Sequence, residues 1–103
     1  MTVPQLELSI ALSDNERTQP LIEGRISPQG IALIPTVVHP SEMFWRQLRF
    51  AEFDISEMSM SSLIISVSRG DTRWVAIPVF TMRRFFHTSI IVRKDSGIAT
   101  PAE

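Results

Sequence analysis

The sequence predicts an α/β fold in which helices flank a mainly parallel sheet. Apolar runs with the length or alternation of strands recur along the chain, and segments with helical spacing separate several of them. Glycine, proline, serine and aspartate stand at many of the boundaries, where turns and caps are expected. Strands that alternate with helices favour parallel pairing, because the chain crosses back over the sheet through each helix.

The first strand is predicted at residues 6–12, where Leu6, Leu8 and Ile10 alternate with polar residues. Residues 13–15 have the composition of a turn or a helix cap. Glu16–Ile22 is expected to form a short helix, limited to about two turns by its proline.

The second strand is predicted at Ile31–Val38, with Pro35 marking an edge or a bend. Pro40–Phe53 then has the clearest helical pattern, with Ser41 as the expected N-cap. Its wide apolar stripe, rich in aromatic residues, is more typical of a core face than of a ligand site.

The second half predicts a brief strand at Phe53–Ile55 and a helix with Ser56 as its cap. Small residues on that helix, Ser62 and Ser66, favour close packing against a neighbour. Two further strands are expected; they are Trp74–Phe80, an almost continuous apolar run, and Ser89–Val92.

Composition excludes several classes of function. The chain has 103 residues and a net charge of −1, so neither a nucleic-acid partner nor a membrane partner is expected. It contains no cysteine, which excludes disulfides, thiolate zinc sites and a thiol nucleophile. Its two histidines, His39 and His87, have no carboxylate at ligand spacing, so no metal site is expected. With no secretory signal at the N-terminus, we expect a cytoplasmic protein.

Two polar segments follow predicted strands. Asp14 lies just after the first strand, and in open α/β sheets ligands bind beyond the carboxyl ends of the strands. Ser56 and Ser59 lie at an expected helix N-terminus, where hydroxyl and amide donors face an anion. An ordinary capped turn explains each segment equally well.

A third candidate is the pair Arg83 and Arg84 together with His87. Two guanidinium groups beside the end of an apolar strand suit a carboxylate ligand, because their planar forks match its two oxygens. His87 can exchange a proton near neutral pH. A solvated basic loop is the alternative interpretation, and the residues alone favour it slightly.

Several segments, in order and with matching spacing over nearly the whole chain, resemble the N-terminal part of the 4,5-dihydroxyphthalate decarboxylase family. They are Arg17–Arg25, Pro40–Phe53, Asp54–Ser59, Arg69–Asp71, Val75–Phe80 and the set Arg83, Phe85 and His87. The family is similar to type II periplasmic-binding proteins, which have two α/β lobes around a cleft. Its members are roughly three times as long as this chain, which exceeds a single small domain.

The resemblance implies that residues 1–97 form most of a first lobe. Residues 98–103 would begin the connection to a second lobe, which this chain lacks. We therefore expect a truncated chain with an exposed sheet edge and an exposed apolar helix face, and hence poor solubility or self-association.

The resemblance also implies an activity, the non-oxidative decarboxylation of a hydroxylated aromatic dicarboxylate to protocatechuate and CO2, with no cofactor. His87 would supply the proton and Arg83 would hold the remaining carboxylate, while Ser56, Ser59 and Asp14 would bind substrate oxygens. Phe86 departs from the family, which often has arginine there, and Arg84 would then compensate. The full-length form could be a homo-oligomer, and the chain alone is expected to be inactive. A module that binds an aromatic carboxylate without catalysis is the alternative.

Overall fold

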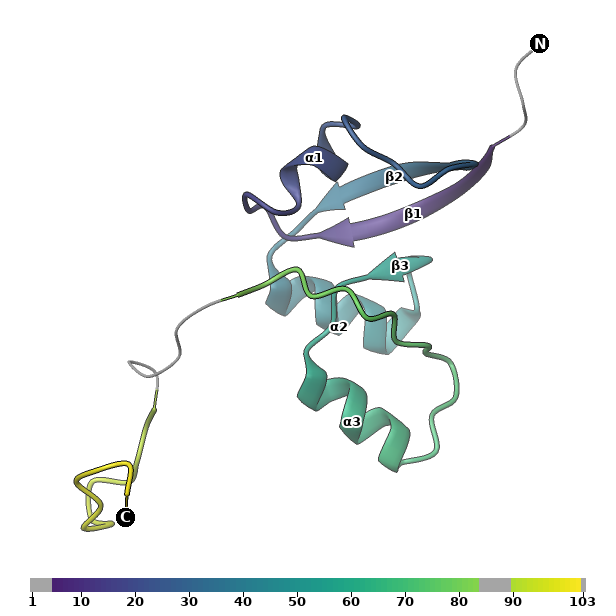
Figure 1. The fold of residues 1–103 in the computed structure, drawn as a ribbon. Helices are drawn as coiled ribbons and strands as arrows, with labels where there is room; N and C mark the ends of the chain where they lie inside the picture. Colours follow the sequence, from purple (N-terminus) through teal and green to yellow (C-terminus); the bar gives the residue numbers. More distant parts are fainter. Residues whose placement is uncertain (1–4, 84–89, 103) are drawn as a thin grey trace.

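The computed structural model describes residues 5–83 and 90–102 (Figure 1). The strands are β1 (Leu6–Leu12), β2 (Ile31–Val37) and β3 (Ile55–Ser56). The helices are α1 (Gln19–Ile22), α2 (Pro40–Phe50) and α3 (Met60–Ser68). The predicted α/β class is confirmed, and a small open parallel sheet with flanking helices is compatible with part of a larger lobe.

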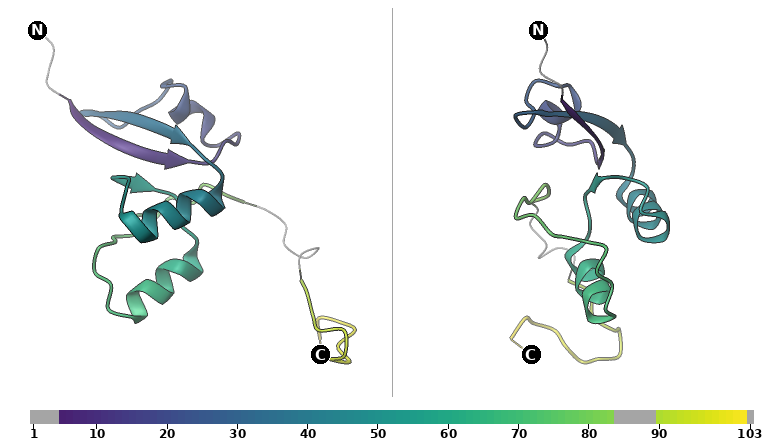
Figure 2. Two further views of the ribbon diagram at one scale, coloured as in Figure 1. Left: turned by 180° about the vertical axis from the view of Figure 1, so that it is seen from behind. Right: turned by 90° about the vertical axis from the view of Figure 1, so that its right-hand side faces the viewer.

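The sheet has the order β2–β1–β3, and both strand pairs are parallel. β1 pairs with β2 along its whole length, from Leu6 opposite Ile31 to Leu12 opposite Val37. The two connections cross the sheet in opposite directions, so right-handed crossovers place α1 and α2 on opposite faces. Figure 2 shows the two helices on either side of the strands.

Pairing between β1 and β3 involves only two residues of β3, and carboxylates extend it at both ends. Ser9 donates its N–H to Asp54 Oδ2 at 2.9 Å, and Ser13 donates its N–H to Glu57 Oε1 at 2.5 Å. Both serines lie two residues from Ala11, which is opposite Ser56 in the ladder. Their N–H groups therefore point toward the same neighbour as that of Ala11. The side chains of Asp54 and Glu57 thus accept the N–H groups of Ser9 and Ser13, which the short backbone of β3 leaves without a ladder partner.

The core lies where β1 meets α2 and the loop that precedes β3. Ala11 and Met43 are fully buried, and Phe53 is 7% exposed. Val38 and Phe44 pack against this cluster. The aromatic stripe predicted for the core is only partly confirmed, because Trp45 and Phe50 are each 60% exposed and contact each other edge to face.

The turn from α2 to β3 is fixed by two side chains of the helix. Gln47 is buried, and its amide accepts the N–H of Phe53 and donates to the Phe53 carbonyl, both at 2.9 Å. Arg46 donates two hydrogen bonds of 2.6 Å to Glu52 and lies over the Phe53 ring. Hydrogen bonding to Glu52 raises the pKa of Arg46, and the same contact lowers the pKa of Glu52.

Two predicted helix caps are wrong. α2 begins at Pro40 with His39 as its N-cap, whose Nδ1 accepts the N–H of Ser41 at 3.2 Å. Proline at the first helical position holds the preceding residue extended, which is the conformation of a cap. Ser56 remains paired in β3, so α3 begins later, with Ser59 as the N-cap that accepts the N–H of Ser62.

The two strands predicted after α3 are absent from the part of the chain that the structure describes. Residues 74–80 and 90–92 have no ladder partner, and Ser89 lies outside the described residues. Val75 is 90% exposed and Phe80 is 66% exposed. An apolar run forms a strand only where a neighbouring strand accepts its hydrogen bonds, and here the run lies against no such neighbour.

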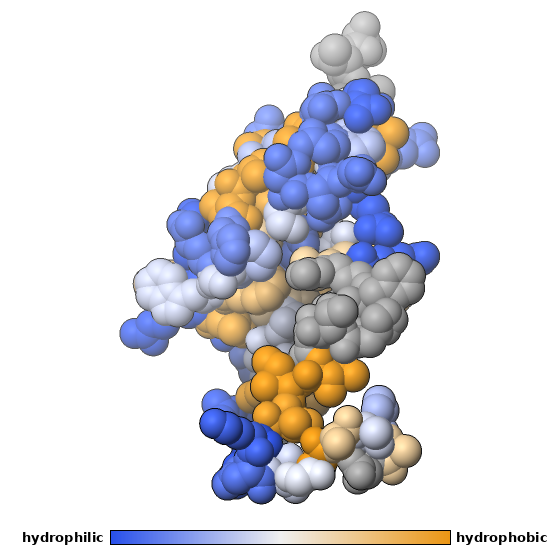
Figure 3. Space-filling view, turned by 90° about the vertical axis from the view of Figure 1, so that its left-hand side faces the viewer, coloured by the Kyte–Doolittle hydropathy of each residue, from blue (hydrophilic) through white to orange (hydrophobic). Residues whose placement is uncertain are grey.

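Apolar surface is abundant. α3 buries none of its residues, although most of them are apolar. Figure 3 shows apolar side chains, in orange, at several places on one face of the molecule. The radius of gyration is 17.8 Å, whereas a compact domain of 100 residues has about 13 Å. The chain therefore presents large apolar areas to water.

We predict that Gln47→Ala lowers the free energy of unfolding by about 3 kcal/mol, because it leaves the buried N–H and C=O of Phe53 without partners. Urea denaturation followed by circular dichroism measures the change. Arg49→Ala, on the exposed side of the same helix, is the matched control and should stay within about 0.5 kcal/mol of the parent. Equal losses in the two variants would contradict this role of Gln47.

We also predict that the 103-residue chain self-associates, because exposed apolar areas of this extent aggregate in water. Sedimentation velocity should show a sedimentation coefficient that rises with concentration. The double variant Val75→Lys and Ile77→Lys should weaken the association, whereas Thr72→Lys with Thr100→Lys adds the same charge outside the apolar run. A single monomeric species for the parent at every concentration would refute the prediction.

Candidate functional site

The carboxyl ends of β1 and β3 are adjacent, since Ala11 pairs with Ser56. Three of the predicted site residues lie at this edge of the sheet: Asp14 follows β1, Ser56 ends β3, and Ser59 is the N-cap of α3. Their common location follows from the parallel pairing, which brings the ends of neighbouring strands together. The structure thus gathers residues that are about 45 positions apart in the sequence.

The turn after β1 is held by a buried threonine. Thr18 is 1% exposed, and its hydroxyl donates to the Ser13 carbonyl at 2.6 Å while accepting the N–H of Asn15 at 3.0 Å. Asn15 Oδ1 in turn accepts the N–H of Arg17 at 2.8 Å. Asp14 is exposed at the tip of this turn, where it accepts a hydrogen bond from Gln19 Nε2.

The two serines at the edge are half-buried, and both hydroxyls already make internal hydrogen bonds. Ser56 Oγ donates to the carbonyl of Glu57 at 2.8 Å. Ser59 Oγ donates to Ser62 Oγ at 2.7 Å and accepts the Ser62 N–H at 3.1 Å. A hydroxyl oxygen accepts up to two hydrogen bonds, so Ser56 Oγ keeps accepting capacity for a donor from outside.

Glu57 is the central side chain of this edge, and the sequence analysis missed it. Its Oε1 accepts both the N–H and the hydroxyl of Ser13, at 2.5 and 2.9 Å. Its Oε2 accepts the hydroxyl of Thr81 at 2.7 Å. One carboxylate therefore joins β1, β3 and the segment after α3. No local signal in the sequence identifies it, because its partners are 44 and 24 positions away.

The basic candidates follow Thr81 in the sequence. Arg83 is exposed and lies two residues beyond Thr81, whose hydroxyl binds Glu57 at this edge of the sheet. Arg84 and His87 lie outside the described residues. Among the described residues, no group of three histidine, cysteine or acidic side chains is placed to hold a metal ion.

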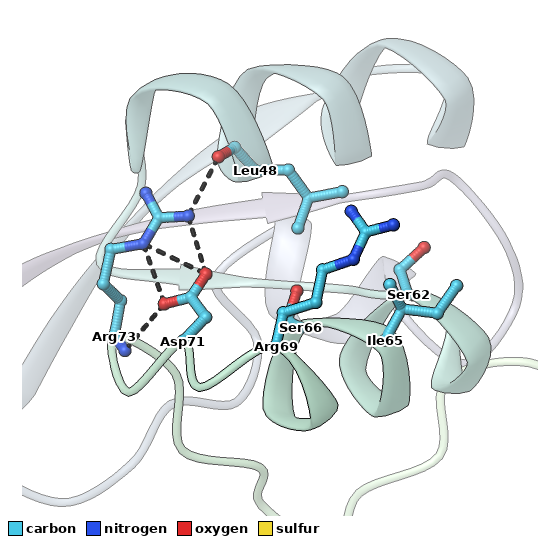
Figure 4. Close-up of a pocket in the computed structure, with 7 residues that line it drawn as sticks. All are labelled: Leu48, Ser62, Ile65, Ser66, Arg69, Asp71 and Arg73. Carbon is cyan, nitrogen blue, oxygen red and sulfur yellow. Dashed lines mark hydrogen bonds and ion pairs between the residues drawn. The ribbon is translucent and has the colours of Figure 1, made fainter.

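A separate hollow of about 390 Å³ lies between the C-terminal part of α2 and α3 (Figure 4). The residues that line it are Leu48, Ser62, Ile65, Ser66, Arg69, Asp71 and Arg73. Ser62 and Ser66, predicted to allow close packing, face this open space instead. Of the predicted site residues that the structure describes, none lines the hollow, which lies near the amino end of β3 rather than its carboxyl end.

Asp71 and Arg73 form the ionic contact of this hollow. Arg73 donates to both carboxylate oxygens of Asp71, and its Nη2 also donates to the carbonyl of Leu48 at 3.1 Å (Figure 4). Hydrogen bonding by the Arg73 side chain lowers the pKa of Asp71 to about 2, with a smaller contribution from Trp74 Nε1. The pair ties the segment after α3 to the end of α2.

None of the described helices has the length and apolar character needed to cross a membrane.

We predict that Arg73→Gln returns the pKa of Asp71 from about 2 toward the ordinary value of 3.8. In the parent, the lowered pKa makes this contact stabilising above the unfolded pKa, and that stability is lost as the pH falls through about 2. NMR titration of the Asp71 carboxyl carbon measures both states. Arg69→Gln, which lines the same hollow, is the control and should leave the pKa of Asp71 unchanged; an equal shift there would refute the assignment to Arg73.

Comparison with known proteins tests the resemblance. No family model matches the chain. The chain is 39% identical over 99 residues, 96% of its length, to a 4,5-dihydroxyphthalate decarboxylase of Comamonas testosteroni. A protein of the same name from Pseudomonas putida is also 39% identical over 99 residues. These matches cover 30% and 38% of the two relatives, so the chain spans about a third of their length. The expected resemblance is confirmed: along almost its whole length, this chain is similar in sequence to part of the 4,5-dihydroxyphthalate decarboxylases.

Proposed function

We propose that this chain forms part of an enzyme that decarboxylates 4,5-dihydroxyphthalate or a closely related hydroxylated aromatic dicarboxylate. The observation that carries the proposal is 39% identity to two proteins named for that activity, over 96% of the chain. Residues 1–97 would contribute to one lobe, and residues 98–103 would lead toward a second lobe. The substrate would bind between the two lobes.

The chemistry requires a proton donor and a carboxylate clamp. Each carboxylate of 4,5-dihydroxyphthalate has a hydroxyl para to it, and electron release from that hydroxyl makes the carboxylate-bearing ring carbon basic. Protonation of this carbon interrupts the aromatic system. The bond between the ring carbon and the carboxylate then breaks, its electron pair restores the aromatic ring, and CO2 leaves. One proton is taken up for each CO2 released, and no electrons are exchanged with a redox partner.

The residues of this chain suit these tasks. His87 would donate the proton, because imidazolium is a competent acid near neutral pH. Arg83 would hold the carboxylate that remains, through paired hydrogen bonds. Ser56, Ser59 and Asp14 would bind substrate oxygens at the carboxyl edge of the sheet, and Arg84 would add positive charge. The exposed position of Arg83 and the shared edge of the three polar residues support this arrangement.

A chimaera tests the proposal. In it, the 99 aligned residues of this chain replace the matching segment of the Comamonas testosteroni decarboxylase. We expect the chimaera to release CO2 from 4,5-dihydroxyphthalate. His87→Ala should lower kcat by at least about 100-fold, the usual loss when a general acid is removed. Arg83→Gln should raise KM by about tenfold or more, because it removes a charged hydrogen-bonding partner of the substrate.

Arg93→Gln is the matched control for Arg83, since Arg93 is exposed and paired with Asp95 in a turn. It should leave both kinetic constants within about twofold. Normal turnover by the His87→Ala chimaera would refute the proton-donor role. Tight binding of the dicarboxylate without CO2 release by the unmodified chimaera would instead support a binding module.

The isolated 103-residue chain should release no CO2, because one wall of a cleft neither encloses the substrate nor excludes water from it. Measurement of CO2 from 4,5-dihydroxyphthalate at high protein concentration checks this expectation. The unmodified chimaera serves as the positive control. Detectable decarboxylation by the isolated chain would contradict the need for a second lobe.

A further inference from the structure

Three parts of the chain that are distant in sequence meet at one carboxylate. Glu57 accepts two hydrogen bonds from Ser13, which begins the turn that carries Asp14. It accepts a third from Thr81, which lies two residues before Arg83. Ser13 and Thr81 are 44 and 24 positions away from Glu57 in the sequence. The contact therefore fixes the tertiary arrangement of two predicted substrate-binding segments.

The contact with Thr81 is significant because little else holds that segment. Residues 74–80 have no ladder partner, and Val75, Ile77, Val79 and Phe80 are between 63% and 90% exposed. Upstream, the segment is tied to α2 by Arg73, which donates to the carbonyl of Leu48. Downstream, the Thr81 hydroxyl donates the hydrogen bond to Glu57 that ties the segment to the sheet edge. Among the described residues, this contact is the polar anchor at the downstream end of the segment from residue 74 to Arg83.

We propose that Glu57 is a positioning residue, which holds the segment bearing Arg83 and the turn bearing Asp14 in a fixed relation at the carboxyl edge of the sheet. This inference rests on the proposed function. Both oxygens of Glu57 accept hydrogen bonds, from Ser13 and from Thr81, and Glu57 acts through these two neighbours. Pre-organisation of this kind lowers the entropy lost when a ligand binds. The Glu57–Thr81 contact thereby aids binding of the remaining carboxylate by Arg83.

Double spin labelling tests the fixed relation directly, because the chain contains no cysteine of its own. Glu16→Cys and Met82→Cys, both at exposed positions, carry the labels. Pulsed electron resonance on labelled protein, diluted with unlabelled protein, gives the distribution of distances between the turn and the segment. We expect a narrow distribution in the parent, and a width about doubled by Thr81→Val, because the unanchored segment samples many positions.

Three further variants distinguish loss of the Glu57–Thr81 contact from a general loss of stability. Thr81→Ser retains the hydroxyl and should restore the narrow distribution. Thr72→Val makes the same chemical change at an exposed position just before this segment, upstream of Arg73, and should leave the width unchanged. Glu57→Asp keeps the charge but shortens the side chain, so it should broaden the distribution as Thr81→Val does. A distribution equally narrow in Thr81→Val and Glu57→Asp would overturn the proposal.

Kinetics of the chimaera test the consequence for the ligand. Thr81→Val should raise KM by about fivefold to tenfold and leave kcat within about twofold, since Arg83 binds a carboxylate that does not react. Thr81→Ser should restore KM. A variant that is merely unstable would lose active enzyme, which lowers kcat and leaves KM unchanged. An unchanged KM in an active chimaera whose label distances broaden would therefore overturn the positioning role.

Failure of the proposed function has a different signature. An unmodified chimaera without decarboxylase activity would overturn that function, and with it any role of Glu57 in binding this substrate. In that case, the label distances would still show the Glu57–Thr81 contact. If the unmodified chimaera is active but its label distances do not show the Glu57–Thr81 contact, the inference about Glu57 is overturned and the decarboxylase proposal stands.

Discussion

The junction between β1 and β3 depends on two carboxylates that replace missing backbone pairs. β3 contributes a ladder of only two residues, opposite Ile10 and Ala11. Asp54 and Glu57, which flank it, accept the N–H groups of Ser9 and Ser13 on the same side of β1. An unpaired N–H group inside a sheet is costly, so acidic residues at both ends allow a very short strand to join a long one. The position of Ser56, Glu57 and Ser59 relative to β1 follows from this junction.

The neighbouring turn from α2 brings β3 to its place. Gln47 and Arg46 fix the chain at Phe53 and Glu52, directly before Asp54. Helix, turn and short strand are thus one hydrogen-bonded unit, joined to the sheet by Phe53 in the core. This unit sets the geometry at the carboxyl edge of the sheet, because Ser56, Glu57 and Ser59 follow it within a few residues.

Much of this fold could be predicted from local patterns. Alternating apolar residues identified β1, and proline with a helical stripe identified α2. The pattern failed where tertiary context decides: residues 74–80 have the composition of a buried strand, but they have no ladder partner, and Val75 remains 90% exposed. For the site, topology explains why Asp14, Ser56 and Ser59 share an edge. Glu57 was missed because its partners, Ser13 and Thr81, are far away in sequence, and no local spacing reveals such a contact.

The order of the strands also has a consequence for synthesis on the ribosome. β1 is made before β2 and β3 but lies between them in the described sheet. Its first partner starts 25 positions later, at Ile31, and its second starts at Ile55. A nascent chain that has released only β1 and β2 therefore exposes one full edge of its central strand. Until residues 54–57 emerge, Ser9 and Ser13 can pair only with water, a chaperone or another nascent chain.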